Sequence, residues 1–231
     1  MMLDIRLRTA ADMVPVGARL ADIGSDHAYL PIALCLEGKI QCALASDINE
    51  GPVMAAQINI QKNKLSSKIT AVKADGLDKT KDFAPSCITV LGMGGELIVS
   101  ILGKAEWIKN EEITLVLQPM THPEILAKYL VQNGFAIVDD KIVRDGSRDD
   151  RIYRVISAKY DGVERELTDA EAHIGRVNLD RGDETTRAYC ERLIRILDTR
   201  ARGRLSSGGD AQAELDLIDQ IKKEIVKHEG N

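Results

Sequence analysis

Residues 19–31, RLADIGSDHAYLP, constrain the fold of this chain more than any other stretch. A short apolar run with Leu20, Ala21 and Ile23 ends at Gly24, a polar turn follows, and apolar residues then resume at helical spacing. A buried strand that breaks at a glycine and leads into a helix is typical of a nucleotide-binding βαβ unit. The glycine permits a tight turn and close approach of a ligand, and the helix start offers free N–H groups.

The chain continues as an alternation of strands and helices. We expect strands over residues 19–23, 41–46, 69–74, 87–91 and 113–117, and helices over residues 4–16, 28–37, 51–63, 97–102 and 123–132. Repeated strand–helix units predict a parallel sheet with right-handed crossovers.

The end of the sheet breaks this alternation. Residues 135–143 and 151–160 both have strand character, and the short polar segment between them leaves no room for a helix. We therefore expect an antiparallel hairpin there. An α/β sheet of seven strands whose last pair is such a hairpin matches the class I methyltransferase variant of the Rossmann-like fold.

After about residue 160 the strand-like runs end and the sequence becomes helical. Three stretches have helical periodicity: residues 168–178, 184–205 and 210–227. A Ser/Gly connector joins the last two, which predicts a C-terminal α-helical, coiled-coil-like hairpin. We expect residues 1–160 to form the cofactor-binding domain and residues 161–231 to form a second, helical domain.

Composition and charge exclude several classes of protein. The chain is 44% hydrophobic and 29% charged, which is typical of a globular protein. It has no apolar run of the ~18–20 residues that span a bilayer and no leader sequence, so we expect no membrane partner and a cytoplasmic location. Four scattered cysteines without CxxC pairs or nearby histidines argue against a metal site and against disulfides. The net charge of −5 leaves a nucleic-acid partner possible, because local clusters of charge matter more than their sum.

Three aspartates lie at the ends of successive predicted strands: Asp22, Asp47 and Asp75. Asp47 follows Gly24 by 23 positions, close to the spacing at which an acid holds ribose hydroxyls in these folds. Asp75 is placed to accept a hydrogen bond from an adenine amino group. Aspartate also commonly ends strands and caps helices, so each one alone is weak evidence, but three in register favour a nucleoside site.

The turn after the first strand reads GSDH and lacks the GxGxxG pattern that a pyrophosphate requires. The phosphates of a dinucleotide would also meet the negative charge of Asp26. S-adenosylmethionine has no phosphate and carries a cationic amino group and a sulfonium, which an acidic loop attracts. We therefore expect S-adenosylmethionine as the cofactor in preference to NAD.

Several segments together resemble the bacterial tRNA methyltransferases that modify N1 of adenine 22. They are ADIGSDHAYLP at 21–31, DINEGP at 47–52, LGMGGELI at 91–98, LQPM at 117–120, NGF at 133–135 and RIYRVI at 151–156, with Arg6-Leu7 ahead of the first strand. The resemblance covers about residues 3–160 and is weak in the C-terminal helices. One departure is Asn49, with Asp47 retained. The resemblance implies methyl transfer from S-adenosylmethionine to adenine N1 in tRNA.

The resemblance and the strand ends together assign the site. The cofactor-binding residues are expected to be Arg6, Asp22, Gly24, Ser25, Asp26, Asp47, Ile48, Asp75, Gly76, Gly92, Met93 and Gly94. Adenine N1 has an in-plane lone pair and needs no prior deprotonation, so catalysis rests on positioning and on electrostatics around the sulfonium. The GMGG loop accordingly lacks the (N/D)PPY acceptors of enzymes that methylate exocyclic amino groups.

Asp26, His27 and Tyr29 are the candidate catalytic residues, which would orient the base or accept a later proton. The alternatives are a hydrogen bond at a helix N-terminus for His27 and a ring packed over the cofactor for Tyr29. Gln118 and Met120 are candidates to touch the target base, although a strand that ends at a proline explains them better.

A tRNA partner needs a basic surface. Residues 187–204 hold six arginines against two acids, whereas residues 210–229 hold three lysines against six acids. The arginines either contact tRNA or are neutralised by the neighbouring helix. A second candidate surface lies around the hairpin turn and holds Arg144, Arg148, Arg151 and Arg154.

We expect a monomer or weak dimer. Two rival functions are a methyltransferase acting on another RNA or on a small molecule, and a non-catalytic module that binds nucleotides or RNA.

Overall fold

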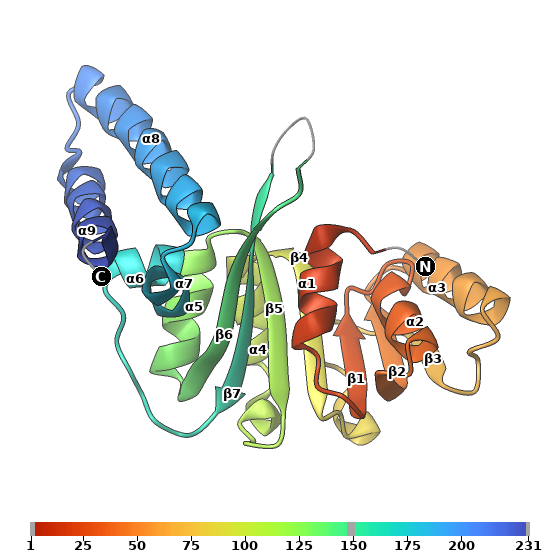
Figure 1. Ribbon diagram of the computed structural model, residues 1–231. Helices are drawn as coiled ribbons and strands as arrows, with labels where there is room; N and C mark the ends of the chain where they lie inside the picture. The colour runs from red at the N-terminus through yellow and green to blue at the C-terminus, as the bar shows by residue number, and fades with distance from the viewer. Residues whose placement is uncertain (1–2, 147–150, 230–231) are drawn as a thin grey trace.

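A single seven-stranded sheet forms the centre of the computed structural model, which describes residues 3–146 and 151–229 (Figure 1). The strands are β1 (Ala18–Ile23), β2 (Ile40–Asp47), β3 (Ile69–Lys73), β4 (Cys87–Gly94), β5 (Thr114–Thr121), β6 (Phe135–Arg144) and β7 (Ile152–Tyr160). Their order across the sheet is β3-β2-β1-β4-β5-β7-β6. Strands β1 to β5 are parallel, and β7 pairs antiparallel with both β5 and β6. The predicted parallel sheet with a closing hairpin is confirmed.

The direction of winding reverses between β1 and β4, because the chain crosses from β3 at one edge to β4 on the other side of β1. In open α/β sheets, ligands bind at this switch point, outside the carboxyl ends of the strands. Asp22 of β1 lies in register with Thr89 of β4, which brings a carboxylate and a hydroxyl together at this place.

Helices cover both faces of the sheet (Figure 1). One core contains residues of α1 (Ile5–Met13), α2 (Tyr29–Leu36) and α3 (Glu50–Lys62). The second core contains residues of α4 (Gly95–Gly103) and α5 (Pro123–Gln132). Since both faces are covered, the central strands are apolar almost throughout and do not alternate. Two short 3-10 turns, Lys81–Phe83 and Glu106–Ile108, complete this part of the chain.

The C-terminal part is helical, as predicted. It consists of α6 (Asp169–Ile174), α7 (Arg176–Arg181), α8 (Glu184–Ser206) and α9 (Gln212–Glu229). Figure 1 shows α8 and α9 as an antiparallel pair beside the sheet, and a third core joins them to Ile142 of β6. Within residues 3–146 and 151–229, no helix is both long and apolar enough to cross a membrane.

The single helix expected over residues 168–178 is wrong, because Gly175 divides it into α6 and α7. Gly175 has φ +95, and a Cβ there would lie 2.1 Å from Oδ2 of Asp140. The chain therefore turns where the backbone must pass close to a buried carboxylate, which only glycine allows.

That carboxylate belongs to a buried polar junction between the β6–β7 hairpin and the short helices. Asp140 is fully buried, and Arg154 of β7 forms a salt bridge with it at 2.7 Å. Arg154 also donates to the carbonyl oxygen of Ala172 in α6, and Asn178 of α7 donates to Asp140 at 2.8 Å. Arg154 was expected on a basic surface, which is wrong because its side chain is buried and paired. Arg148, from the same set, lies outside the described residues.

Candidate active site

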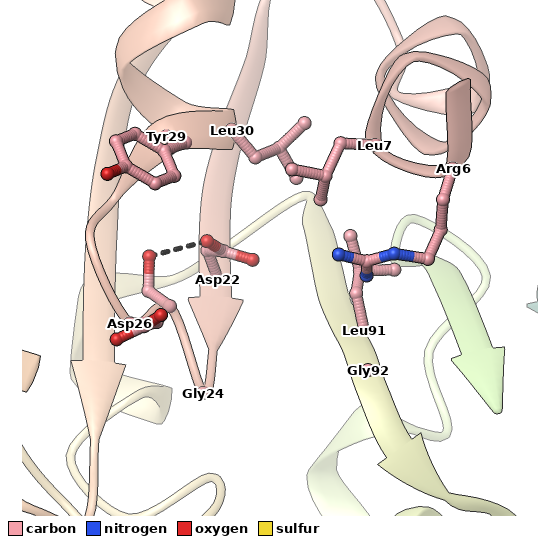
Figure 2. A pocket seen from close by; sticks show the side chains of 10 residues that line it. Arg6, Leu7, Asp22, Gly24, Asp26, Tyr29, Leu30, Leu91 and Gly92 are labelled. Carbon is pink, nitrogen blue, oxygen red and sulfur yellow. Dashed lines mark hydrogen bonds between the residues drawn. The ribbon is translucent and has the colours of Figure 1, made fainter. Parts of the chain in front are cut away.

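A cleft of about 260 Å³ opens at the switch point of the sheet (Figure 2). Residues of α1, of β1 and the turn after it, of α2 and of β4 line it: Arg6, Leu7, Asp22, Gly24, Ser25, Asp26, Tyr29, Leu30, Leu91 and Gly92. Seven of these were predicted as site residues. The cleft therefore brings together the N-terminal helix, the GSDH turn and the end of β4.

Asp22 forms the buried floor of the cleft. Its Oδ2 accepts a hydrogen bond from the Ser25 hydroxyl at 2.5 Å, and its Oδ1 accepts one from the Thr89 hydroxyl at 2.6 Å. Burial raises the pKa of the Asp22 carboxyl, although these two hydrogen bonds and the positive charge of Arg6 oppose the rise. A carboxylate in this position gains from a cationic group that enters the cleft.

The GSDH turn is fixed by its backbone. Gly24 has φ +70, and a Cβ there would lie 2.2 Å from Cε of Met93, so a side chain at this position would have to displace that methionine. The Ser25 amide donates to the carbonyl oxygen of Ser46 at 2.9 Å, which ties the turn to β2. Helix α2 then begins without a side-chain cap on its first turn. The turn thus leaves backbone groups at the rim, as the sequence predicted.

The three candidate catalytic residues lie on this turn and at the start of α2. Asp26 is exposed, and its Oδ1 lies 3.6 Å from Nε2 of His27. The rings of His27 and Tyr29 stack with their centroids 5.1 Å apart, and Tyr29 is 44% exposed. Asp26 and Tyr29 line the cleft, whereas His27 lies beside it. Accessible aromatic faces next to a carboxylate can hold a planar, electron-poor ring.

The opposite wall carries a positive charge. Figure 2 shows the guanidinium of Arg6, from α1, across the cleft from Asp22 and Asp26. Its Nη1 donates to Oε1 of Gln118 at 3.1 Å. The cleft therefore has carboxylates on one side and a guanidinium on the other, which complements a ligand that carries both an amino group and a carboxylate.

The remaining predicted cofactor residues lie outside this cleft. Asp47 and Ile48 stand at the end of β2, and Met93 and Gly94 stand at the end of β4. Asp75 and Gly76 follow β3 and line a separate cavity of about 100 Å³. All of these residues stand at or just after the carboxyl ends of parallel strands, so they share one edge of the sheet. Their contacts with a cofactor stay a prediction.

Sequence reasoning missed three apolar residues of the cleft, Leu7, Leu30 and Leu91. Helical or strand periodicity explains each of them as a core residue, so their sequence context carries no signal of a site. Gln118 was considered as a contact to the target base, and this is wrong because its side chain is fully buried. Met120 is 49% exposed, which leaves it accessible.

No group of three or more His, Cys, Asp or Glu side chains is placed to hold a metal ion in the part of the chain that the structure describes.

Replacing Asp22 by asparagine should change how the stability of the fold depends on pH, and it should weaken cofactor binding. An acid whose pKa is raised by folding stabilises the fold below its unfolded pKa, and this contribution disappears as the pH rises through the folded pKa. We compare the free energies of unfolding in urea at pH 5 and pH 8. The value for Asp22→Asn should increase relative to the value for the wild type as the pH rises. Affinity for S-adenosylhomocysteine should fall about tenfold, because the variant lacks the charge that attracts the amino group.

Asp12→Asn is the matched control, because Asp12 is exposed on α1 and lies outside the cleft. It should change neither the pH dependence nor the affinity. A stability difference between Asp22→Asn and the wild type that narrows with rising pH would contradict the assignment of Asp22.

Comparison with known proteins agrees with this geometry. A family model described as a methyltransferase domain matches residues 3–156. The tRNA (adenine(22)-N(1))-methyltransferase of Bacillus subtilis (strain 168) is 38% identical over 167 residues, which cover 68% of each chain.

Solved structures match almost the whole chain. A protein of the NADB-Rossmann superfamily from Streptococcus agalactiae is 32% identical with a TM-score of 0.87, and 97% of this chain and 98% of that chain are covered. A Streptococcus pneumoniae protein, solved with S-adenosyl-L-methionine as a candidate tRNA (m1A22) methyltransferase, is 29% identical with a TM-score of 0.82 and coverage of 97% and 100%. The chain belongs to the methyltransferase-domain family and, within it, to the tRNA (adenine(22)-N1)-methyltransferases.

Proposed function

We propose that this protein transfers the methyl group of S-adenosylmethionine to N1 of adenine 22 in tRNA. One observation carries the proposal: the cleft at the switch point sets the carboxylates of Asp22 and Asp26 against the guanidinium of Arg6. This arrangement fits the amino acid end of S-adenosylmethionine. The relative from Bacillus subtilis, named for the adenine 22 reaction, supports the choice of substrate.

The strand ends extend this arrangement toward the nucleoside. Asp47 would accept both ribose hydroxyls, and Asp75 would accept from the adenine amino group. Ile48, which is 56% exposed, offers an apolar side chain to the adenine ring. Gly92 has φ +78 and is exposed near the end of β4, so its backbone can approach the ligand closely there. Gly76, Met93 and Gly94 would complete this wall.

When bound, S-adenosylmethionine supplies a methyl group that its sulfonium activates. Adenine N1 attacks that carbon with its lone pair, the carbon–sulfur bond breaks, and the positive charge moves to the methylated base. Asp26 would stabilise this charge, and the stacked rings of His27 and Tyr29 would hold the base in plane with the line of attack. The chain thus contributes position and charge to a reaction that needs no base for its first step.

The α8–α9 pair and the end of the β6–β7 hairpin that holds Arg144 and Arg151 are the proposed tRNA contacts. Figure 1 shows both projecting from the same side of the sheet. Several α8 arginines pair with acids: Arg195 with Glu191, Arg202 with Asp198, and Arg204 with Glu214 of α9. Arg187 and Arg200 are exposed as well, so α8 presents positive charge that acids of its own and of α9 only partly offset.

The proposal also includes a domain boundary at residue 160, a cytoplasmic location and a monomer or weak dimer.

Methylation of an unmodified tRNA transcript with labelled S-adenosylmethionine tests the function. We expect label in 1-methyladenosine at position 22, and we expect no label in a transcript in which guanosine replaces adenine 22. Label at another position or in another RNA would support the first rival function. Tight binding of S-adenosylhomocysteine without any transfer to tRNA would support a non-catalytic module.

A further inference from the structure

Gln118 of β5 is the most enclosed polar side chain beside the cleft. It is fully buried, and its carboxamide contacts three different segments. Its Oε1 accepts hydrogen bonds from Nη1 of Arg6 and from the Gly92 amide, both at 3.1 Å. Its Nε2 donates to the carbonyl oxygen of Pro119 at 2.9 Å and lies 3.4 Å from the Met120 sulfur. A buried carboxamide whose oxygen and nitrogen both have partners is held in a single orientation.

The hydrogen bond from the Gly92 amide to Gln118 replaces a backbone hydrogen bond that the sheet cannot make at this position. Leu91 pairs with Gln118 and Met93 pairs with Pro119, so Gly92 is an extra residue on β4 at a shift of register. The amide of a bulge residue loses its place in the ladder of backbone hydrogen bonds. Gln118 supplies the missing acceptor from its side chain and so fixes the β4 bulge that lines the cleft.

The bond to Arg6 fixes the direction of its guanidinium. Arginine has many rotamers, and Nη2 of Arg6 also lies 3.7 Å from Oδ2 of Asp4, whose side chain is mostly exposed. Without Gln118, the guanidinium would keep this exposed partner but lose its buried one, and it could then swing toward solvent. With Gln118 in place, the Arg6 side chain is 21% exposed and faces the cleft. Holding a ligand-binding group in its binding rotamer reduces the entropy lost when the ligand binds.

We infer that Gln118 is a positioning residue of the cofactor site, which aims Arg6 at the carboxylate of the methionyl group. This inference rests on the proposed function, because it takes S-adenosylmethionine as the ligand. Gln118 touches neither cofactor nor base: it acts on the carboxylate through Arg6, and on the backbone beside the ligand through the Gly92 amide. Its loss should therefore weaken the binding of ligands that carry the carboxylate much more than the binding of ligands that lack it.

The test compares S-adenosylhomocysteine with 5′-methylthioadenosine, which has the same nucleoside but no amino acid carboxylate. Gln118→Met keeps the volume of the side chain and removes its hydrogen bonds. Calorimetry should show an affinity for S-adenosylhomocysteine that is about tenfold lower, equivalent to about 1.4 kcal/mol. The affinity for 5′-methylthioadenosine should stay within twofold of the wild type. In an Arg6→Met background, the further effect of Gln118→Met on S-adenosylhomocysteine should shrink to its small effect on 5′-methylthioadenosine.

Thr114→Val is the matched control, because Thr114 is a buried polar residue at the other end of β5. It should alter the binding of neither ligand. Should Gln118→Met fail to fold, Gln118→Asn withdraws the carboxamide from Arg6 by one methylene and should give the same selective loss. Equal losses for both ligands would reduce Gln118 to a structural residue and overturn the inference. A wild type that binds neither ligand would instead refute the proposed function.

Discussion

Arg154→Met should lower the free energy of unfolding by about 3–5 kcal/mol, because it leaves the fully buried Asp140 carboxylate without its cation. Burial lowers the pKa of the Arg154 guanidinium, but the charge of Asp140 and its hydrogen bonds outweigh this and raise it. The Arg154 guanidinium is therefore charged in the folded protein, with the Asp140 carboxyl as its buried partner. Urea unfolding followed by circular dichroism measures the loss.

Two further variants separate this effect from a general loss of an arginine. Arg165→Met breaks an exposed pair with Asp161 and should change stability little, because solvent screens such pairs. The double variant Arg154→Met with Asp140→Asn removes the unpaired charge and should recover most of the loss. Two outcomes would contradict the stabilising role of the pair: an Arg154→Met protein as stable as the wild type, or a double variant no more stable than Arg154→Met alone.

The same variants connect the junction to function. Asp140 and Arg154 join the β6–β7 hairpin to α6 and α7, and these short helices lead into α8. The cofactor cleft lies at β1 and β4, on the other side of β5. In the folded fraction of the Arg154→Met protein, affinity for S-adenosylhomocysteine should therefore match the wild type.

The sheet could be predicted from the sequence because its signals are local. Apolar runs that end in aspartate or glycine, such as the one before Gly24, mark buried strands wherever they occur. The lack of room for a helix after residue 143 gave the antiparallel hairpin by length alone. Positions such as Asp22, Asp26 and Gly92 followed from these strand ends, and the structure brings them together with Arg6 in one cleft.

The failures have a common physical cause, which is contact between residues far apart in sequence. The break at Gly175 depends on Asp140, which passes close to it in the folded chain. Arg154 has the same local context as a surface arginine, and its burial depends on that same carboxylate. Gln118 has the context of a strand end, and its role depends on a shift of register in β4 and on a helix at the N-terminus. One-dimensional patterns carry no trace of such pairings.

Asp47→Ala should weaken the binding of S-adenosylhomocysteine about hundredfold. The carboxylate stands at the carboxyl end of β2, where one oxygen accepts from the Asn49 amide at 2.8 Å. In the proposed complex it also accepts from two ribose hydroxyls, and hydrogen bonds to a charged group contribute ~1.5–3 kcal/mol each. Two such bonds, discounted for partial exposure, correspond to about a hundredfold change in affinity. Calorimetry measures it directly, and kcat at saturating cofactor should change much less than KM.

Two further variants, Asp47→Asn and Glu50→Ala, separate the proposed ribose contact from the hydrogen bond to the Asn49 amide and from the general effect of negative charge near the site. Asp47→Asn keeps an acceptor for the Asn49 amide and removes the charge, so its affinity should fall between those of the wild type and Asp47→Ala. Glu50 is an exposed acid three residues further on, at the start of α3, where it pairs with Lys73 at 3.9 Å, and its removal should leave affinity unchanged. A 2′-deoxyribose analogue of S-adenosylhomocysteine lacks one of the hydroxyls that Asp47 is proposed to bind. The ratio between the affinities of the wild type and of Asp47→Ala should therefore be much smaller for this analogue than for S-adenosylhomocysteine. If the variant discriminates against this analogue as strongly as the wild type does, the carboxylate does not bind the ribose, and the nucleoside must lie elsewhere along the strand ends.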